Sequence, residues 1–220
     1  MGVEERQEVM SRAISNKNVL SAQFAVLPFD GAWKASFGCP ELRGTWIVYG
    51  GSGSGKTTFV MQLCKYLSRF GRVAYNSLEQ GLSLSLKKAW ERVGMEDAGS
   101  RIVLLEKESL RDLTARLKKR QSADVVVIDS LHYWFRFNMA DYLKLKNTFP
   151  GKLFVYVAHE KGGQPKGTMA QNIRYDADVK VRVEGYKAFV STRYEVPERG
   201  EGGKDYVVWV EGARKYWAEL

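Results

Sequence analysis

The sequence contains few of the residues that characterise secreted and membrane proteins. Only two cysteines occur in 220 residues, Cys39 and Cys64, and their separation fits no metal-ligand spacing. This argues against a disulfide scaffold or a zinc site and favours a reduced compartment. No apolar run approaches the roughly 20 residues of a membrane span, and the N-terminus, MGVEERQEVMSR, lacks the apolar core of a signal peptide. We therefore expect a cytoplasmic protein without a membrane partner.

Acidic residues are also in the minority. Lys and Arg number 34 against 25 Asp and Glu, which gives a formal net charge of +9. Such a surplus suits a polyanionic partner such as nucleic acid, but a basic and merely soluble surface would have the same composition. Because 45% of the residues are hydrophobic, the chain can bury a full core. We expect a single domain over residues 1–220.

Apolar runs and helical patterns alternate from Thr45 to about Ala158. Five short apolar runs are expected to be buried strands: TWIVYG, RVAYNSLE, RIVLL, ADVVVIDS and KLFVYVAH. TTFVMQLCKYLSRF and LSLSLKKAWERVG have apolar residues at helical spacing, and SLRD at residues 109–112 has the capping-box pattern that opens a helix. The alternation predicts an α/β fold with a mostly parallel, doubly wound sheet.

The pattern changes after Asp176. DVKVRVEG, YKAFVSTRYEV and DYVVWVE predict three shorter strands that extend one sheet edge in antiparallel fashion. PERGEGGK, between the last two, is expected to be an exposed hairpin loop. We assign residues 1–44 to an N-terminal arm or lid, 45–211 to the core and 212–220 to a tail. Residues 1–20 are polar and fit either a short helix or a flexible arm.

The stretch GGSGSGKTTF, residues 50–59, lies between the first predicted strand and the first predicted helix. It fits the phosphate-loop pattern G-x-x-x-x-G-K-[ST]. Glycines let successive backbone N–H groups turn toward phosphate oxygens, and the helix N-terminus adds partial positive charge. Lys56 is expected to contact the β- and γ-phosphates of ATP, and Thr57 to ligate Mg²⁺. The predicted nucleotide-binding residues are Gly50, Gly51, Ser52, Gly53, Ser54, Gly55, Lys56, Thr57 and Thr58.

Three further side chains are expected at the carboxyl ends of parallel strands, the edge where a doubly wound sheet binds its ligand. Asp129 ends VVVIDS and is either the second Mg²⁺ ligand or a cap of the next segment. Glu79 follows the second strand and could polarise an attacking water, or could be a solvated turn residue. His159 closes KLFVYVAH and could contact the γ-phosphate or that water, or could be a satisfied core histidine.

Two segments could contact nucleic acid. Residues 160–174 are too many for a tight turn and include Lys161, Lys166 and Arg174, so they could follow a phosphate backbone. An ordinary exposed loop is the alternative. LHYWFRFNM, residues 131–139, mixes aromatic side chains with an arginine, as base-stacking platforms do. Aromatic residues after a core strand more often pack in the core or in a subunit interface.

These motifs, in this order, resemble the RecA-like ATPases, especially their DnaB-type helicase and RadA branches. The residues that carry the resemblance are GGSGSGKTTF, YNSLEQG, VVVIDS, VYVAHEKGG and DADVKVRV, followed by a strand that bears STR. The resemblance runs from about Gly44 to Trp209. It implies a RecA-like P-loop NTPase fold with antiparallel C-terminal strands. A chain of this size is similar to the small stand-alone cores of phages and mobile elements.

The resemblance also implies roles for individual residues. Glu79 has the position of the general base and His159 that of the γ-phosphate sensor, and the loop after His159 would touch single-stranded DNA. Arg193 looks like the basic finger that a neighbouring subunit donates, although Ser191 stands where DnaB-like and RadA-like proteins tend to have a lysine. Together with Lys56, these three residues form the predicted catalytic set. A finger that acts between subunits implies a homo-oligomeric ring or filament.

We expect a Mg²⁺-dependent ATPase that is stimulated by single-stranded DNA and acts in recombination, repair or replication, with a protein of those processes as a further partner. Two other classes stay open. One is a KaiC-like, ATP-driven regulatory switch with a protein partner, and the other is a small-molecule kinase on a P-loop core. Stimulation of the ATPase rate by DNA would separate the DNA-directed ATPase from these two classes. The sequence leaves open the choice between ATP and GTP, the oligomer number and the strand polarity.

Overall fold

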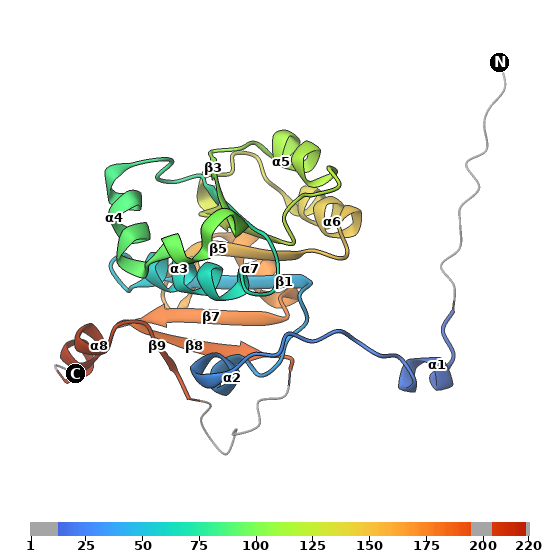
Figure 1. Cartoon of the computed structure of the whole chain (residues 1–220), viewed down its shortest axis with the longest axis horizontal. Coiled ribbons are helices and arrows are strands. Elements are labelled where there is room, and N and C mark those ends of the chain that lie inside the picture. The colour runs from blue at the N-terminus through green and yellow to red at the C-terminus, as the bar shows by residue number, and fades with distance from the viewer. Residues whose placement is uncertain (1–12, 195–203, 219–220) are drawn as a thin grey trace.

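The computed structural model describes residues 13–194 and 204–218. The strands within these residues belong to one nine-stranded sheet (Figure 1). The strand order is β3-β2-β4-β5-β1-β7-β8-β9, and β6 pairs with β5 off this path. All five strands predicted before residue 160 are confirmed, and they pair in parallel. They are β1 (Gly44–Gly50), β2 (Val73–Ser77), β3 (Ile102–Glu106), β4 (Val125–Asp129) and β5 (Leu153–Lys161).

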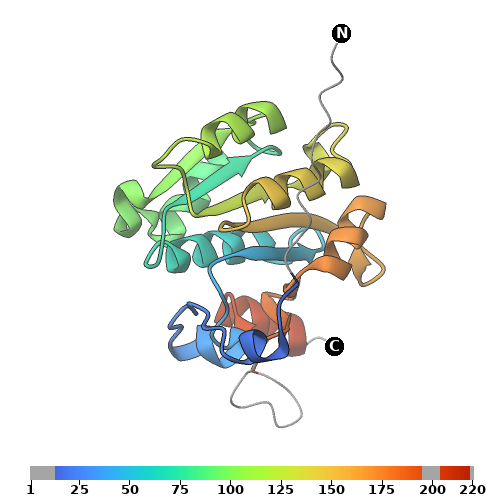
Figure 2. The ribbon, with the colours of Figure 1, turned by 90° about the vertical axis from the view of Figure 1, so that its right-hand side faces the viewer.

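Helices cover both faces of the parallel sheet (Figure 2). Successive side chains of a strand point to opposite faces, so Trp46 and Val48 of β1 belong to one buried cluster and Ile47 and Tyr49 to the other. The first face is covered by α3 (Lys56–Leu67), α4 (Leu84–Val93) and the 3₁₀ segment η1 (Met95–Arg101). The second face is covered by α5 (Leu110–Leu117), α6 (Met139–Thr148) and α7 (Thr168–Asp176).

Strands form at all three predicted C-terminal segments, but the first is parallel to its neighbour β1, against the prediction, and the third is shorter than predicted. β7 (Val179–Glu184) lies parallel to β1, and β8 (Lys187–Thr192) and β9 (Tyr206–Val207) continue in antiparallel fashion. The predicted strand DYVVWVE is wrong beyond Val207, because β9 ends there and α8 (Val210–Ala218) begins three residues later and contains most of the predicted tail. The predicted loop PERGEGGK, apart from Lys204, lies outside the described residues.

A helix is favoured at α8 because it places Gly212 and Ala213 on one buried face. A Cβ atom at Gly212 would lie only 2.2 Å from the Trp209 ring and 2.7 Å from the Tyr186 ring. The close packing against the turn between β7 and β8 is a long-range contact. The local pattern of β-branched and aromatic residues gave no indication of it.

The N-terminal part reaches the core just before and within its second helix, since Leu27 and Phe29 are already buried in it. α1 (Asn16–Leu20) has no buried residue and stands apart from the sheet (Figure 1). α2 (Gly31–Phe37) packs through Phe37, whose ring stacks on Trp46 at 5.6 Å and on Phe59 at 6.4 Å. In residues 13–194 and 204–218, none of the helices has the length and hydrophobicity that a bilayer span requires.

The segment predicted as one long loop, residues 160–174, is a hairpin followed by a helix. β5 continues to Lys161, and β6 (Gln164–Pro165) pairs back on it. Gly162 and Gly163 have φ of +60° and +75°, as a two-residue hairpin turn requires. The loop prediction is therefore wrong, because the two glycines close the hairpin and Thr168 begins α7.

Candidate active site

Two glycines of the loop between β1 and α3 lie so close to neighbouring atoms that a side chain would not fit at either position. A Cβ atom at Gly50 would lie 2.3 Å from the Val183 carbonyl oxygen. Gly55 has φ of +94° and lies under Tyr186, whose ring would be 2.9 Å from an added Cβ. The Tyr186 N–H donates to the Ser54 carbonyl oxygen at 3.0 Å. The turn between β7 and β8 therefore holds the loop in a shape that these glycines permit.

The start of α3 presents unpaired donors. Within the described part of the chain, the N–H groups of Gly55, Lys56 and Thr57 have no hydrogen-bond acceptor. The first turn of a helix leaves such groups free, and they carry the positive end of the helix dipole. The Ser54 hydroxyl is also buried without a partner. These donors converge on one loop and fit the phosphate groups of a nucleotide.

Asp129 ends β4 beside this loop and is only 8% exposed. Its carboxylate accepts a short hydrogen bond from the Tyr75 hydroxyl, which comes from the neighbouring strand β2. Burial raises the pKa of the Asp129 carboxyl, while the Tyr75 hydrogen bond and the positive charge of Lys56 oppose that rise. An oriented carboxylate close to Lys56 fits the predicted second ligand of Mg²⁺.

Glu79 and His159 are brought together by the register of the sheet. The N–H groups of Leu78 and Glu79 donate to the Asp129 carbonyl oxygen at 2.7 and 3.1 Å, which anchors the turn after β2 to the end of β4. His159 of β5 is the register partner of Gly50. Glu79 Oε2 lies 3.1 Å from His159 Nε2, and both side chains are 34% exposed. A carboxylate and an imidazole thus meet at the phosphate loop, within reach of solvent.

Two polar residues of this cluster were not predicted as site residues. The Ser130 hydroxyl lies 3.4 Å from His159 Nε2. The His132 ring packs against the His159 ring with 4.7 Å between centroids. The sequence grouped His132 with the aromatic segment, and only the crossover from β4 to β5 places it on His159. The one signal in the sequence for a role of His132 at the site was its position three residues after Asp129, which ends a strand.

The aromatic segment at residues 131–139 divides between the two alternatives. Trp134 and Phe137 stack at 4.4 Å and pack against the core, which is the packing role. Tyr133 and Phe135 are 51% and 84% exposed. Base stacking is therefore open to the exposed pair alone.

A cavity of about 540 Å³ opens beside the first turn of α3. Tyr186 and Trp209 meet edge to face at 5.0 Å in its wall. Gln62 lines it too, with a buried Oε1 that has no partner and an amide N–H that donates to the Val208 carbonyl oxygen. An aromatic wall and a free acceptor fit a nucleotide base. Sequence reasoning missed this cavity because α3, α4, the β7–β8 turn and the segment between β9 and α8 build it jointly; its lining residues are Thr58, Gln62, Arg92, Val93, Tyr186, Val208 and Trp209.

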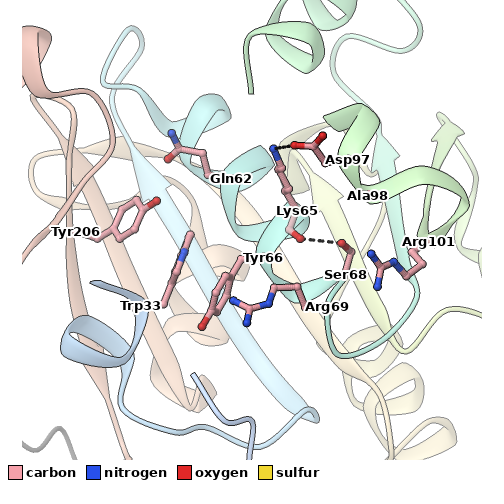
Figure 3. A pocket seen from close by; sticks show the side chains of 10 residues that line it. All are labelled: Trp33, Gln62, Lys65, Tyr66, Ser68, Arg69, Asp97, Ala98, Arg101 and Tyr206. Carbon is pink, nitrogen blue, oxygen red and sulfur yellow. Dashed lines mark hydrogen bonds and ion pairs between the residues drawn. The ribbon is translucent and has the colours of Figure 1, made fainter. Parts of the chain in front are cut away.

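A second cavity of about 390 Å³ lies along the C-terminal half of α3 (Figure 3). Its aromatic side chains already pack on one another: Trp33 lies 4.8 Å from Tyr66 and 4.2 Å from Tyr206 between ring centroids. Lys65 forms an ion pair with Asp97 at 2.7 Å. Because these groups are occupied by each other and lie away from the phosphate loop, we assign this cavity a packing role.

Two solved structures share the architecture of this chain. The flagellar accessory protein FlaH from Methanocaldococcus jannaschii matches with a TM-score of 0.53 and 16% identity, over 73% of this chain and 80% of that chain. The KaiC-like protein PH0186 from Pyrococcus horikoshii OT3 matches with a TM-score of 0.52 and 19% identity, over 76% of this chain and 84% of that chain. The chain has the RecA-like P-loop fold. No protein-family model and no curated protein matches the sequence.

The three residues predicted to contact DNA differ in exposure. Lys161 and Lys166 are exposed on the β5–β6 hairpin, next to His159. Arg174 lies in the last turn of α7, half-buried over the Tyr49 ring, with a buried Nε. The two lysines are exposed at the sheet edge that bears the phosphate loop, and Arg174 packs against the sheet.

Arg193 lies at the opposite end of the sheet from the phosphate loop. Thr192 pairs with Val179, which in turn pairs with Trp46 near the start of β1. With a rise of about 3.3 Å per residue, this places Arg193 at least about 13 Å from Gly50. Its guanidinium lies 3.2 Å from the Asp178 carboxylate and is 58% exposed. In a RecA-like fold arranged this way, Arg193 cannot reach the active site of its own chain.

Proposed function

We propose that this protein binds and hydrolyses ATP and couples that reaction to single-stranded DNA in recombination, repair or replication. The observation that carries the proposal is the meeting of Glu79 and His159 beside the phosphate loop, at the strand ends that hold Asp129. A phosphate loop alone would serve any P-loop protein. A carboxylate with a hydrogen-bonded histidine adds a group that can polarise water, which is what hydrolysis requires.

Each side chain has its own role in the proposed reaction. Lys56 and the free N–H groups of the loop bind the β- and γ-phosphates. Thr57 and Asp129 would hold a Mg²⁺ ion, which would neutralise phosphate charge. Glu79 accepts a proton from the attacking water, and His159 fixes the orientation of that carboxylate. The cavity beside Thr58 receives the base.

Contact with single-stranded DNA is assigned to the β5–β6 hairpin and to the exposed pair Tyr133 and Phe135. The hairpin presents Lys161 to solvent two residues after His159, and Lys166 is exposed directly after β6. Cationic side chains neutralise backbone phosphates, and exposed aromatic rings stack on unpaired bases. The net charge of +9 agrees with a polyanionic ligand.

Single-stranded DNA is expected to raise the steady-state ATPase rate several-fold, with a stimulation that fades as salt increases. The fading follows from counterion release, which lowers log affinity by about 0.7 per phosphate contact for each unit of log salt. The measurement is the ATPase rate with and without oligo(dT) between about 50 and 200 mM salt.

The double variant Lys161→Ala/Lys166→Ala should lose most of this stimulation, and Lys119→Ala/Arg120→Ala is the matched control. The control removes the same charge from exposed positions just after α5, away from the hairpin. An ATPase rate that does not change when DNA is added would contradict the assignment of DNA as a ligand. It would favour the ATP-driven switch with a protein partner, or the kinase if a small-molecule acceptor raises the rate.

We further propose that Arg193 completes the active site of a neighbouring subunit in a homo-oligomer. Arg193→Ala alone should be nearly inactive, since a finger contributes about 10³ to 10⁵ in rate, and Glu79→Gln alone should be nearly inactive because it lacks the general base. A mixture of the two variants should recover activity, because some interfaces then combine an intact Glu79 with an intact Arg193. Mixing at several ratios, with the ATPase rate as readout, tests this. Absence of recovery in a confirmed mixed oligomer would contradict action between subunits.

A further inference from the structure

His132 makes polar contacts in two directions at the edge of the active site. Its Nε2 lies 2.8 Å from the Lys166 carbonyl oxygen, at the end of the β5–β6 hairpin. Its Nδ1 lies 3.4 Å from the backbone N–H of His159. One ring nitrogen therefore donates to the hairpin and the other faces a donor on β5. This fixes a single neutral tautomer.

The neutral state agrees with the surroundings of the ring. Partial burial lowers the pKa of His132, and the nearby His159 and Lys166 lower it further, against the effect of the accepting Lys166 carbonyl. The imidazole also packs on the His159 ring, with a tilt of 35° between the ring planes. His132 thus contacts both the hairpin and the residue that orients Glu79.

These contacts form a continuous path from the hairpin to the catalytic carboxylate. Lys166 is tied to this edge twice, because its N–H donates to the His159 carbonyl oxygen at 2.7 Å and its carbonyl accepts from His132. His132 packs on His159, and His159 Nε2 lies 3.1 Å from Glu79 Oε2. The hairpin is therefore linked to the His159 backbone directly and to the His159 ring through His132.

We propose that His132 is a positioning residue that couples the β5–β6 hairpin to the orientation of His159 and Glu79. A ligand that binds Lys161 and Lys166 on the hairpin then changes the rate of hydrolysis through His132, without touching Glu79. The effect on hydrolysis rests on the proposed ATPase function, but the contact that His132 makes is independent of it. The coupling requires the hydrogen bond to Lys166 and not only a ring of the right shape.

Two variants separate these requirements. His132→Phe keeps a flat ring against His159 and removes both hydrogen-bonding nitrogens. His132→Gln removes the ring and keeps an amide N–H that can reach the Lys166 carbonyl. A thermal melt shows whether each variant is folded. If one variant does not fold, the other is used for the tests.

The first test uses the chain without any ligand. Hydrogen–deuterium exchange of the amides in residues 159–166 should be about tenfold faster in His132→Phe than in the wild type, the effect of losing one or two hydrogen bonds. His132→Gln should stay close to the wild type. Equal protection in His132→Phe and wild type would overturn the proposal, whatever the protein catalyses.

The second test measures coupling. In His132→Phe, which lacks the hydrogen bond to Lys166, the ratio of DNA-stimulated to basal ATPase rate should fall at least about fivefold. In His132→Gln, which lacks the ring that packs on His159, the ratio should fall as well. The chain has only two histidines, so its ring Cε1–H NMR spectrum has two signals. The His159 signal should move on addition of oligo(dT) to the wild type and stay in place in His132→Phe. Retained stimulation and a retained shift in His132→Phe would refute the coupling, whereas a wild type without ATPase activity would refute only the proposed function.

Discussion

Replacing Lys56 with alanine is expected to lower the ATP turnover rate by at least about 100-fold, the usual effect of removing a preorganised positive or donor group from a transition state. Lys56 is the first residue of α3, where the free N–H groups of the loop converge. Its charge also acts on Asp129, since it lowers the pKa of that buried carboxyl. Turnover under saturating ATP and nucleotide affinity by calorimetry are the two measurements.

Lys65→Ala is the matched control for Lys56→Ala. Lys65 lies near the other end of the same helix, where it pairs with Asp97 and donates to the Val93 carbonyl oxygen. Its removal should leave the turnover rate almost unchanged and affect only the packing of α3 on η1. If Lys56→Ala hydrolysed ATP as fast as Lys65→Ala, the phosphate-loop assignment would be wrong.

Glu79→Gln should stop hydrolysis while nucleotide binding is retained. General-base catalysis contributes about 10² to 10⁴ in rate, so a fall of that size in kcat is expected. Glutamine has the shape of glutamate and keeps an oxygen that can accept from His159, but it cannot take a proton from water. Single-turnover hydrolysis and equilibrium nucleotide binding, measured on the same sample, separate the chemical step from binding.

Glu106→Gln is the control for Glu79→Gln. Glu106 ends β3, which pairs with β2, so its carboxylate lies at the same sheet edge, and it is exposed. Its neutralisation removes the same charge without touching His159. A similar loss of rate in both variants would mean that the net charge of the edge matters and not the position of Glu79. Loss of nucleotide binding in Glu79→Gln would make Glu79 structural.

Most of the parallel sheet could be read from local patterns. TWIVYG and VVVIDS are largely apolar because helices cover both faces of their strands. Burial on both faces therefore shows as a run of consecutive apolar residues. Ser109 accepts from the Asp112 N–H at the start of α5, as the capping-box pattern predicts. Such signals involve residues a few positions apart and need no knowledge of the rest of the chain.

The errors lie where a long-range contact outweighs the local pattern. Gly162 and Gly163 were read as part of an extended loop, although they form a two-residue turn once β6 can pair with β5. Val210 has the side chain of a strand former, yet it begins a helix because Gly212 must fit against Trp209. α6 was not predicted at all, although Asn138 and Asp141 form a capping box at its start.

Local sequence patterns were sufficient to predict the phosphate loop, the parallel strands and the positions of Asp129, Glu79 and His159 at strand ends, because glycine spacing and apolar runs involve neighbouring residues. Only the tertiary structure decided that Glu79 meets His159, that Tyr186 closes over Gly55 and that His132 joins the hairpin to the site. Strand order and register bring these residues together from separate segments. No short stretch of sequence encodes a contact between strands that are neighbours only after folding.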